Sequence, residues 1–198
     1  FCENLQDVKF PDHLKTIGNR AFYYCIALEN AKLTDSLTRL GRETFAYCRN
    51  LKNVSLSNNL TALSVKVFYQ CESLTAIDVP KNITIIGDYA FYGCAALNSL
   101  NLPSGLESIG QYAFYGCKNL EEVQIPERVG KIGDYSFARC SSLKKVKLPA
   151  CLETMGEYLF YSCSNLEQIN LPKSLKRISD GAFCACEKLT EIEIPEKV

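Results

Sequence analysis

The sequence predicts an α/β solenoid, in which a short coil recurs along the chain and each coil adds one parallel strand. Three observations predict it. Cysteines recur every 23 residues from Cys2 to Cys186, a leucine follows each of them three residues later, and a phenylalanine stands 20 residues after each of the first eight. A fixed period of roughly 20 to 50 residues is the signature of repeat architectures, in which one unit stacks on its copies.

The strand of each repeat is expected just after the leucine. Residues 122–125 alternate between polar and apolar side chains, the pattern of a strand with one buried face. A proline follows in seven repeats and ends the strand, because it has no backbone N–H to donate. Stretches such as residues 88–94 are too short for a stable free helix, so we expect short turns or 3₁₀ segments on the other side of each coil.

A glycine column marks positions where φ is positive or where two backbones approach closely. It comprises Gly18, Gly41, Gly87, Gly110, Gly133 and Gly156. Because one coil cannot bury its own apolar face, the coils must stack. Eight complete repeats and a partial ninth fill residues 1–198, so we expect a single domain. The pattern is already under way at Phe1, which predicts a fragment of a longer protein.

The repeat resembles a known family. Leu120, Val123 and Ile125 resemble the L-x-x-L-x-L core of leucine-rich repeats, and the continuation L-P-x-x-L-x-x-I-G-x-x-A-F-x-x-C is similar to their BspA-type subclass. The resemblance covers essentially the whole chain and implies a horseshoe or gently curved right-handed coil. The usual turn asparagine is not kept as a column, so we expect no asparagine ladder, and other groups or water should bond the turn backbone.

The resemblance also implies a function. Members of the subclass are surface or secreted proteins of host-associated bacteria and some protozoan parasites, associated with adhesion to host proteins or other cells. We therefore expect a non-enzymatic binding module at the cell surface or outside the cell, with a protein or glycan as partner. The alternative is a structural spacer that presents another domain, because this fold has no fixed ligand.

Composition excludes other partners. The formal charge is zero, from 22 basic and 22 acidic residues, which argues against nucleic acid. No apolar run approaches the roughly 20 residues that span a bilayer, so we expect no direct membrane insertion in this segment.

No catalytic, cofactor or metal site is expected. The column cysteines should be buried, reduced thiols, because parallel side chains in one core have poor geometry for pairing. Cys151 and Cys184 lie outside the column, and His13, the only histidine, lies far along the stack from both. A cysteine nucleophile needs a nearby base, so no Cys-His couple is predicted. Paired C-x-x-C motifs, typical of zinc sites, are absent from the sequence.

Two surfaces are candidates for binding. Tyrosines in two columns beside the phenylalanines are expected to stack from coil to coil, with an aromatic binding stripe as the alternative. The outward residues of the strands form a polar face that suits multivalent contacts. The predicted partner-binding residues are Tyr89, Tyr112, Tyr135, Tyr158, Lys145, Lys147, Glu122, Gln124 and Asn101.

Overall fold

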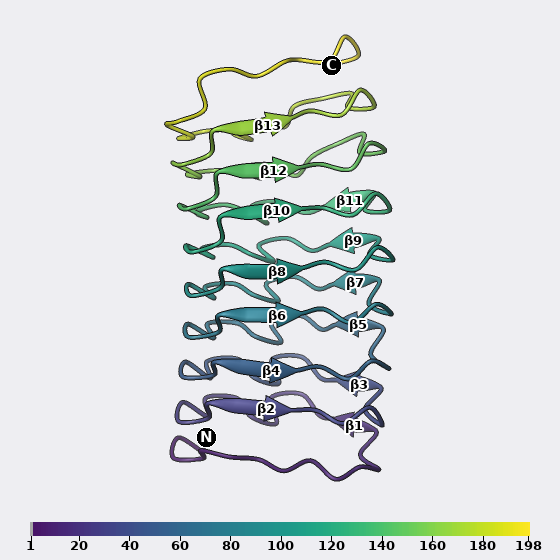
Figure 1. The fold of residues 1–198 in the computed structure, drawn as a ribbon, viewed down its shortest axis with the longest axis vertical. Helices are drawn as coiled ribbons and strands as arrows, with labels where there is room; N and C mark the ends of the chain where they lie inside the picture. Colours follow the sequence, from purple (N-terminus) through teal and green to yellow (C-terminus); the bar gives the residue numbers. More distant parts are fainter. Residues whose placement is uncertain (1) are drawn as a thin grey trace.

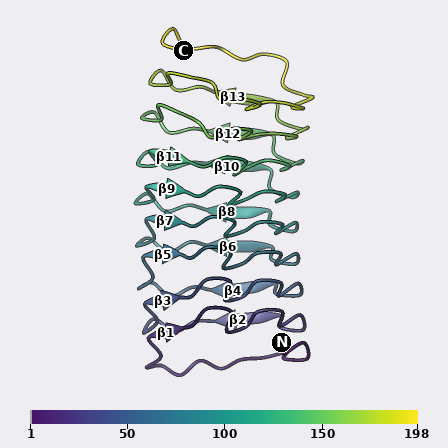
Figure 2. The ribbon, with the colours of Figure 1, turned by 180° about the vertical axis from the view of Figure 1, so that it is seen from behind.

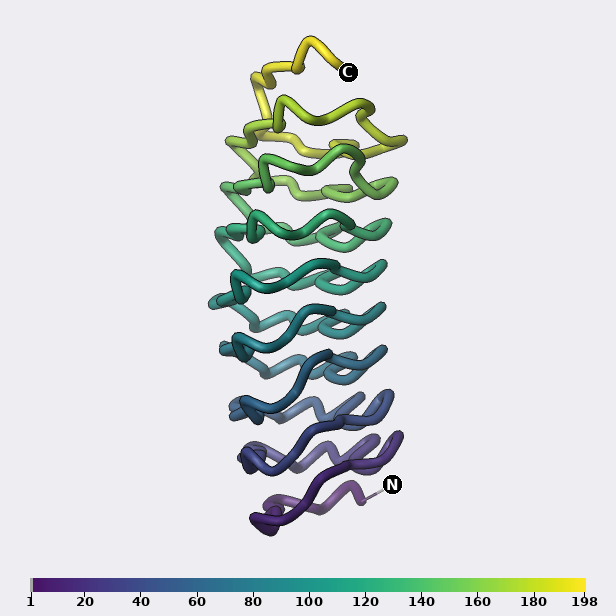
Figure 3. The backbone as a smooth tube through the Cα atoms, turned by 90° about the vertical axis from the view of Figure 1, so that its right-hand side faces the viewer, coloured from purple at the N-terminus to yellow at the C-terminus, as the bar shows by residue number. Residues whose placement is uncertain are grey.

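The protein is a stack of coils whose two chain ends lie at opposite ends of the stack (Figure 1). A computed structural model describes residues 2–198. Each coil between the ends contributes a strand to one side, and several contribute a second, shorter strand to another side (Figure 2). Seen from the side, the coils lie one above another along a single long axis (Figure 3).

Three-residue strands form the first side of the stack. Every pairing recorded among them is parallel and joins residues 23 apart, as in Val123↔Val146↔Ile169. The middle residue of each strand points inward and its two neighbours are exposed, which confirms the strand predicted in each repeat. The strands are β2 (Asn30–Lys32), β4 (Asn53–Ser55), β6 (Ala76–Asp78), β8 (Ser99–Asn101), β10 (Glu122–Gln124), β12 (Lys145–Lys147) and β13 (Gln168–Asn170).

A second set of strands, which the sequence analysis did not predict, follows the turn after the proline column. These strands are only two residues long, too short for alternation to show. Four of them, β5, β7, β9 and β11, form one parallel sheet across four coils. The set is β1 (Thr16–Ile17), β3 (Arg39–Leu40), β5 (Ala62–Leu63), β7 (Ile85–Ile86), β9 (Ser108–Ile109) and β11 (Lys131–Ile132).

The prediction of an α/β fold with 3₁₀ segments is wrong. Residues 2–198 contain no helix of any type, and the protein is a parallel β-solenoid whose coils close through turns. A helix needs consecutive N–H groups to bond back within their own segment. On the third side of the stack, successive N–H groups donate alternately within their own coil and to the next coil. Ala21 donates to Gly18 of its own coil, and Phe22 donates to Thr44 of the next coil.

Backbone conformation also prevents a helix on this side. Residues in two columns of the repeat have positive φ. Arg20 and Tyr89 belong to the first column, each with φ of 57°, and Tyr24 belongs to the second, with φ of 64°. A residue in the left-handed region interrupts a right-handed helical run. The turns of each coil are therefore set by inter-coil hydrogen bonds and by two left-handed residues, four positions apart.

The glycine column allows close approach of backbones rather than positive φ. A Cβ at Gly133 would overlap the backbone of Gln111 in the preceding coil, and one at Gly110 would overlap that of Asp88. Both glycines have φ outside the left-handed region. Of the two roles predicted for this column, close approach is the one that the structure confirms.

The core is a continuous cluster of buried side chains along the stack. The phenylalanine column is fully buried from Phe45 to Phe160, and neighbouring rings from Phe22 to Phe183 stack with centroids 5.1 to 6.0 Å apart. Fully burying such a ring contributes ~1.5–3 kcal/mol. The core position predicted for the phenylalanines is confirmed.

Several groups bond the turn where leucine-rich repeats carry asparagine. Asn59 and Asn82 each donate from Nδ2 to a backbone carbonyl of the preceding coil, and Ser36 and Ser174 do so from Oγ. Cys151 takes the same place with its Sγ, 3.0 Å from the oxygen of Glu127. The expectation that other groups take the place of asparagine is thus confirmed at Ser36, Cys151 and Ser174, whereas Asn59 and Asn82 keep asparagine in two consecutive coils.

Candidate binding surfaces

The strand face, made of the outward side chains of the three-residue strands, holds five of the predicted partner-binding residues. Glu122 and Gln124 lie on β10, opposite Lys145 and Lys147 on β12 in the register of the sheet. All four side chains are exposed. Asn101 lies on β8, and its Nδ2 donates to an aspartate carboxylate on β6 at 3.0 Å. The structure therefore brings the four residues of β10 and β12 together and gives Asn101 a partner on β6.

Only some of the polar side chains on the strand face form ion pairs or hydrogen bonds with other residues of the chain. Lys147 Nζ lies 3.7 Å from Glu127 Oε1. Within the described part of the chain, the side chains of Lys145, Glu122 and Gln124 form no ion pair or hydrogen bond. Their charged and amide groups are thus available for polar contacts, which suit recognition of a polar or charged partner surface.

The first tyrosine column is an aromatic ladder. The rings of Tyr89, Tyr112, Tyr135 and Tyr158 stack with centroids 4.8 to 4.9 Å apart and interplanar angles of at most 7°. All four side chains are half-buried. Because each inner ring has a neighbour on both faces, the column offers a partner mainly ring edges and hydroxyl groups. Stacking, the first interpretation of this column, is confirmed, and no contact shown here tests its binding role.

The second tyrosine column is also a stack of aromatic rings. Tyr69, Tyr92 and Tyr115 stack with centroids 4.7 to 4.8 Å apart. Lys66 Nζ lies 5.4 Å from the centre of the Tyr69 ring, and Arg139 lies over Tyr115 at 5.7 Å, both within the range of cation–π contacts. Burial, followed by neighbouring tyrosines, raises the pKa of Tyr69 to about 12. The column is a row of packed rings, and the Tyr69 hydroxyl stays protonated at neutral pH.

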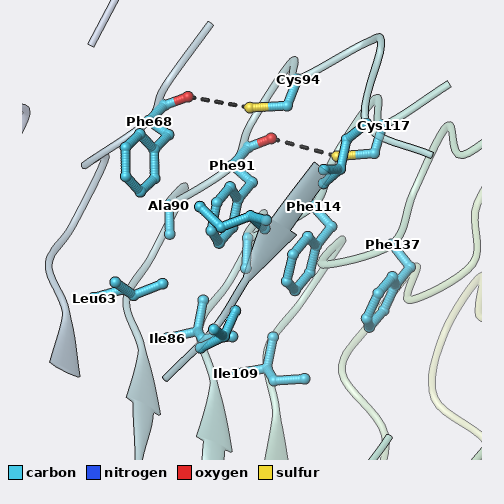
Figure 4. Close-up of a cluster of buried hydrophobic side chains, with 14 of the residues drawn as sticks. Leu63, Phe68, Ile86, Ala90, Phe91, Cys94, Ile109, Phe114, Cys117 and Phe137 are labelled. Carbon is cyan, nitrogen blue, oxygen red and sulfur yellow. Dashed lines mark hydrogen bonds between the residues drawn. The ribbon is translucent and has the colours of Figure 1, made fainter. Parts of the chain in front are cut away.

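The column cysteines line the core beside the phenylalanines (Figure 4). Cys25 to Cys163 are buried free thiols, as predicted, whereas Cys2 is exposed and Cys186 half-buried in the end coils. Cys117 Sγ donates to the carbonyl oxygen of Phe91 at 3.4 Å, and the same bond recurs from coil to coil. Burial raises the pKa of these thiols, to about 12 at Cys140. A thiol of such high pKa is a poor nucleophile and metal ligand.

The remaining candidates for chemistry stay separate. Cys151 and Cys184 are exposed free thiols, and His13 is exposed in the first coil, as the repeat positions predicted. Among residues 2–198, no three His, Cys, Asp or Glu side chains lie close enough together to hold a metal ion. That same stretch has no helix with the length and apolarity to cross a membrane.

An axial groove is the feature that sequence reasoning missed. It has a volume of about 630 Å³ and crosses four coils on the side of β7, β9 and β11, with the glycine column in its lining. Two variable columns flank the glycines in the sequence, and these columns are the sequence feature that marks the groove. Ile85, Ser108 and Lys131 come two residues before these glycines and Asp88, Gln111 and Asp134 one residue after them, and all six line the groove.

Comparison with known proteins agrees with this geometry. A family model of the BspA-type leucine-rich repeat region matches residues 1–98 and 84–198, in six copies. The chain belongs to this family. No functionally curated protein matches it. Leucine-rich repeat families are generally binding or structural proteins, and the BspA-type repeat predicted from the sequence is confirmed.

Solved bacterial leucine-rich repeat proteins are similar in fold. A leucine-rich repeat protein of T. pallidum is 27% identical, with a TM-score of 0.63, over 90% of this chain and 72% of its own. One from Bacteroides ovatus is 25% identical, with a TM-score of 0.55, over 100% of this chain and 74% of its own. The pneumococcal vaccine antigen PcpA is 22% identical, with a TM-score of 0.60, over 93% of this chain and 55% of its own.

Proposed function

We propose that this chain is a non-enzymatic binding module, displayed at a cell surface or secreted, that adheres to a host protein, a glycan or another cell. Membership of the BspA-type family supports the role. The observation that carries it is the strand face, where Lys145, Glu122 and Gln124 are exposed across two paired strands and make no polar contact within the described chain. A face that uses its polar groups for its own stability would leave none of them free.

The strand face supports this proposal better than the tyrosine columns do. Stacked rings already satisfy each other's faces, so Tyr112 can offer only its edge and its hydroxyl. We therefore assign the first contact with a partner to the strand face. The tyrosines Tyr89, Tyr112, Tyr135 and Tyr158 are proposed as a secondary rim that donates hydrogen bonds through their hydroxyls.

Binding of the folded chain to immobilised host matrix proteins and to host cells tests the proposal. We expect saturable binding that falls at least fivefold in Lys145→Glu, because the variant reverses an exposed charge on the middle strand of the sheet β10-β12-β13. Lys81→Glu is the matched control: it makes the same charge change at an exposed turn residue. Folded protein that binds no member of the panel saturably, or equal loss in both variants, would rule the strand face out.

A structural spacer is the second function that a specific observation favours. The phenylalanine ladder runs through the coils without interruption from Phe22 to Phe183, and exposed ion pairs such as Lys52 with Glu29 and Lys144 with Glu121 link neighbouring coils. An uninterrupted stack of this kind can hold another domain at a fixed distance. A spacer should keep its function when a whole 23-residue coil is removed.

A further inference from the structure

In the described part of the chain, the axial groove has charged groups of both signs along one strip, without an ion pair between them. Lys131 and Asp134 both line it, three residues apart in one coil. The equivalent residues two coils further on, Arg177 and Asp180, form an ion pair at 3.2 Å. Within the described chain Lys131 makes no ion pair at all. Among the described residues, Lys131 is therefore without an ion pair in the groove, whereas the paired Arg177 and Asp180 lie outside the groove lining.

The carboxylates beside the groove are held in place before any ligand arrives. Asp88 Oδ1 accepts the backbone N–H of Gln111 at 3.0 Å, and Asp134 Oδ1 accepts that of Glu157 at 2.8 Å. Each carboxylate keeps its second oxygen for another partner, because two oxygens accept independently. Positioned carboxylates lose little side-chain entropy when they bind a cation.

Apolar contact is available in the same strip. Ile85 is 46% exposed, one of three large hydrophobic side chains in the described chain with such exposure, and the other two lie in the last coil. The groove floor of glycine backbone makes its own inter-coil bonds, as in Gly110 N–H to Ile86 O at 2.8 Å. A ligand is thus held by the side chains at the edges and by contact with the floor.

We propose that the axial groove binds an extended polypeptide segment whose basic side chains face Asp88 and Asp134. Four coils at ~4.8 Å spacing give a length of roughly 15 Å, which four to five extended residues at ~3.3 Å each would fill. The two aspartates lie two coils apart, on the order of 10 Å. Basic residues three apart in a polyproline II segment lie on one face of that segment and are ~9 Å apart, which matches this spacing. This inference goes beyond the function proposed above and places a second binding site on a different face.

Chemistry favours a polypeptide over a glycan here. A sugar chain is bound best where an aromatic face can stack on it, and the groove lining contains no aromatic residue. The apolar edge at Ile85 suits an aliphatic side chain, and the fixed carboxylates suit lysine or arginine. An acidic partner would be repelled by Asp88 and Asp134.

Titration of the ¹⁵N-labelled chain with fluorescein-labelled decalysine tests the proposal. Fluorescence anisotropy gives the affinity, and the amide signals of Gly87, Gly110 and Gly133 report contact with the groove floor. We expect saturable binding at low salt, with shifts at these glycine signals. The double variant Asp88→Asn, Asp134→Asn should bind at least tenfold more weakly. Asparagine keeps the Oδ1 that accepts the backbone N–H, so the turns remain capped.

The control is the double variant Asp12→Asn, Glu187→Gln, which removes the same charge from two exposed turn residues and should change the affinity less than twofold. Lys131→Ala should strengthen decalysine binding, a gain that unfolding cannot produce. Equal weakening in the two double variants, unshifted glycine signals, or the same signals shifted by maltoheptaose instead of decalysine would overturn the proposal.

The same variants separate this inference from the proposed function. Host-partner binding that is lost in Lys145→Glu but kept in the groove variant places adhesion on the strand face. If decalysine binding is lost only in the groove variant, the groove is a second site. If host binding fails everywhere while decalysine still shifts the glycine signals, the proposed adhesive function falls and the groove stands.

Discussion

The column thiols from Cys48 to Cys186 each donate a hydrogen bond to the carbonyl oxygen of a phenylalanine 26 residues earlier, at 3.1 to 3.4 Å. The thiol sits in an apolar core and still satisfies its weak donor. Burial disfavours the thiolate and raises the pKa to about 12 at Cys48 and Cys140. At the residue scale, the repeated cysteine therefore acts as a packing residue that also links two coils.

Alkaline pH should weaken the fold through these thiols. The folded pKa of Cys140, about 12, lies above the ordinary value of 9.0. The unfolded chain releases its proton first, so stability is complete below pH 9 and falls as pH rises toward 12, by up to ~1.4 kcal/mol per pH unit per thiol. In urea titrations at pH 8 and 10.5, the destabilisation caused by Cys140→Ala should shrink at the higher pH. A difference that stays constant would contradict the assignment.

The phenylalanine ladder gives a second residue-scale prediction. Phe114 is fully buried between Phe91 and Phe137, with ring centroids 5.2 and 5.1 Å away. Phe114→Ala should lower the free energy of unfolding by ~3–5 kcal/mol, measured by urea denaturation, because it leaves a cavity between two rings. Tyr112→Ala should cost less, since that ring is half-buried. A near-neutral Phe114→Ala would show that the core is placed wrongly.

At the scale of elements, the strands of the first side follow from the sequence and the rest of the coil does not. Alternation at residues 122–125 predicts β10, because one side chain in two must enter the core. The turn side was misread because its geometry depends on inter-coil bonds that local propensity does not encode. Tyr89 adopts φ of 57°, a conformation rare for a tyrosine, while Gly110 does not have positive φ.

Of the two candidate binding surfaces, the strand face could be predicted from the sequence and the axial groove could not. The exposed positions on β10 and β12, such as Lys145, follow directly from alternation. The axial groove requires the two-residue strands and the glycine column to lie side by side, and the strands are too short for alternation to predict them. Its two variable columns become visible as a surface only once the coil is closed.

Two glycines of one coil test the role of the glycine column. A Cβ at Gly133 would overlap the backbone of Gln111, whereas a Cβ at Gly130 meets no atom within 4 Å. Gly133→Ala should therefore destabilise the protein by ~1–3 kcal/mol through overpacking. Gly130→Ala should be neutral or stabilising by ~0.4–1 kcal/mol, because it restricts the unfolded chain. Thermal melts compare the two, and equal melting temperatures would refute close approach at Gly133.

At the scale of the whole molecule, each coil contacts only its neighbours, so the stack should tolerate loss of a unit. Deletion of residues 118–140 removes one full coil and rejoins the columns in register. We expect a folded protein whose urea m-value falls in proportion to the surface removed. Deletion of residues 118–129 shifts every later column and should abolish cooperative unfolding. If both deletions behave alike, the 23-residue register does not govern folding.

The central claim is that consecutive coils stack in a strict 23-residue register through the phenylalanine ladder. The most direct measurement is of nuclear Overhauser contacts between the rings of selectively labelled phenylalanines. The stack predicts contacts between Phe91 and Phe114 and between Phe114 and Phe137, whose centroids are 5.2 and 5.1 Å apart, and none between Phe91 and Phe137. A contact between Phe91 and Phe137, or none between neighbours, would contradict the stack.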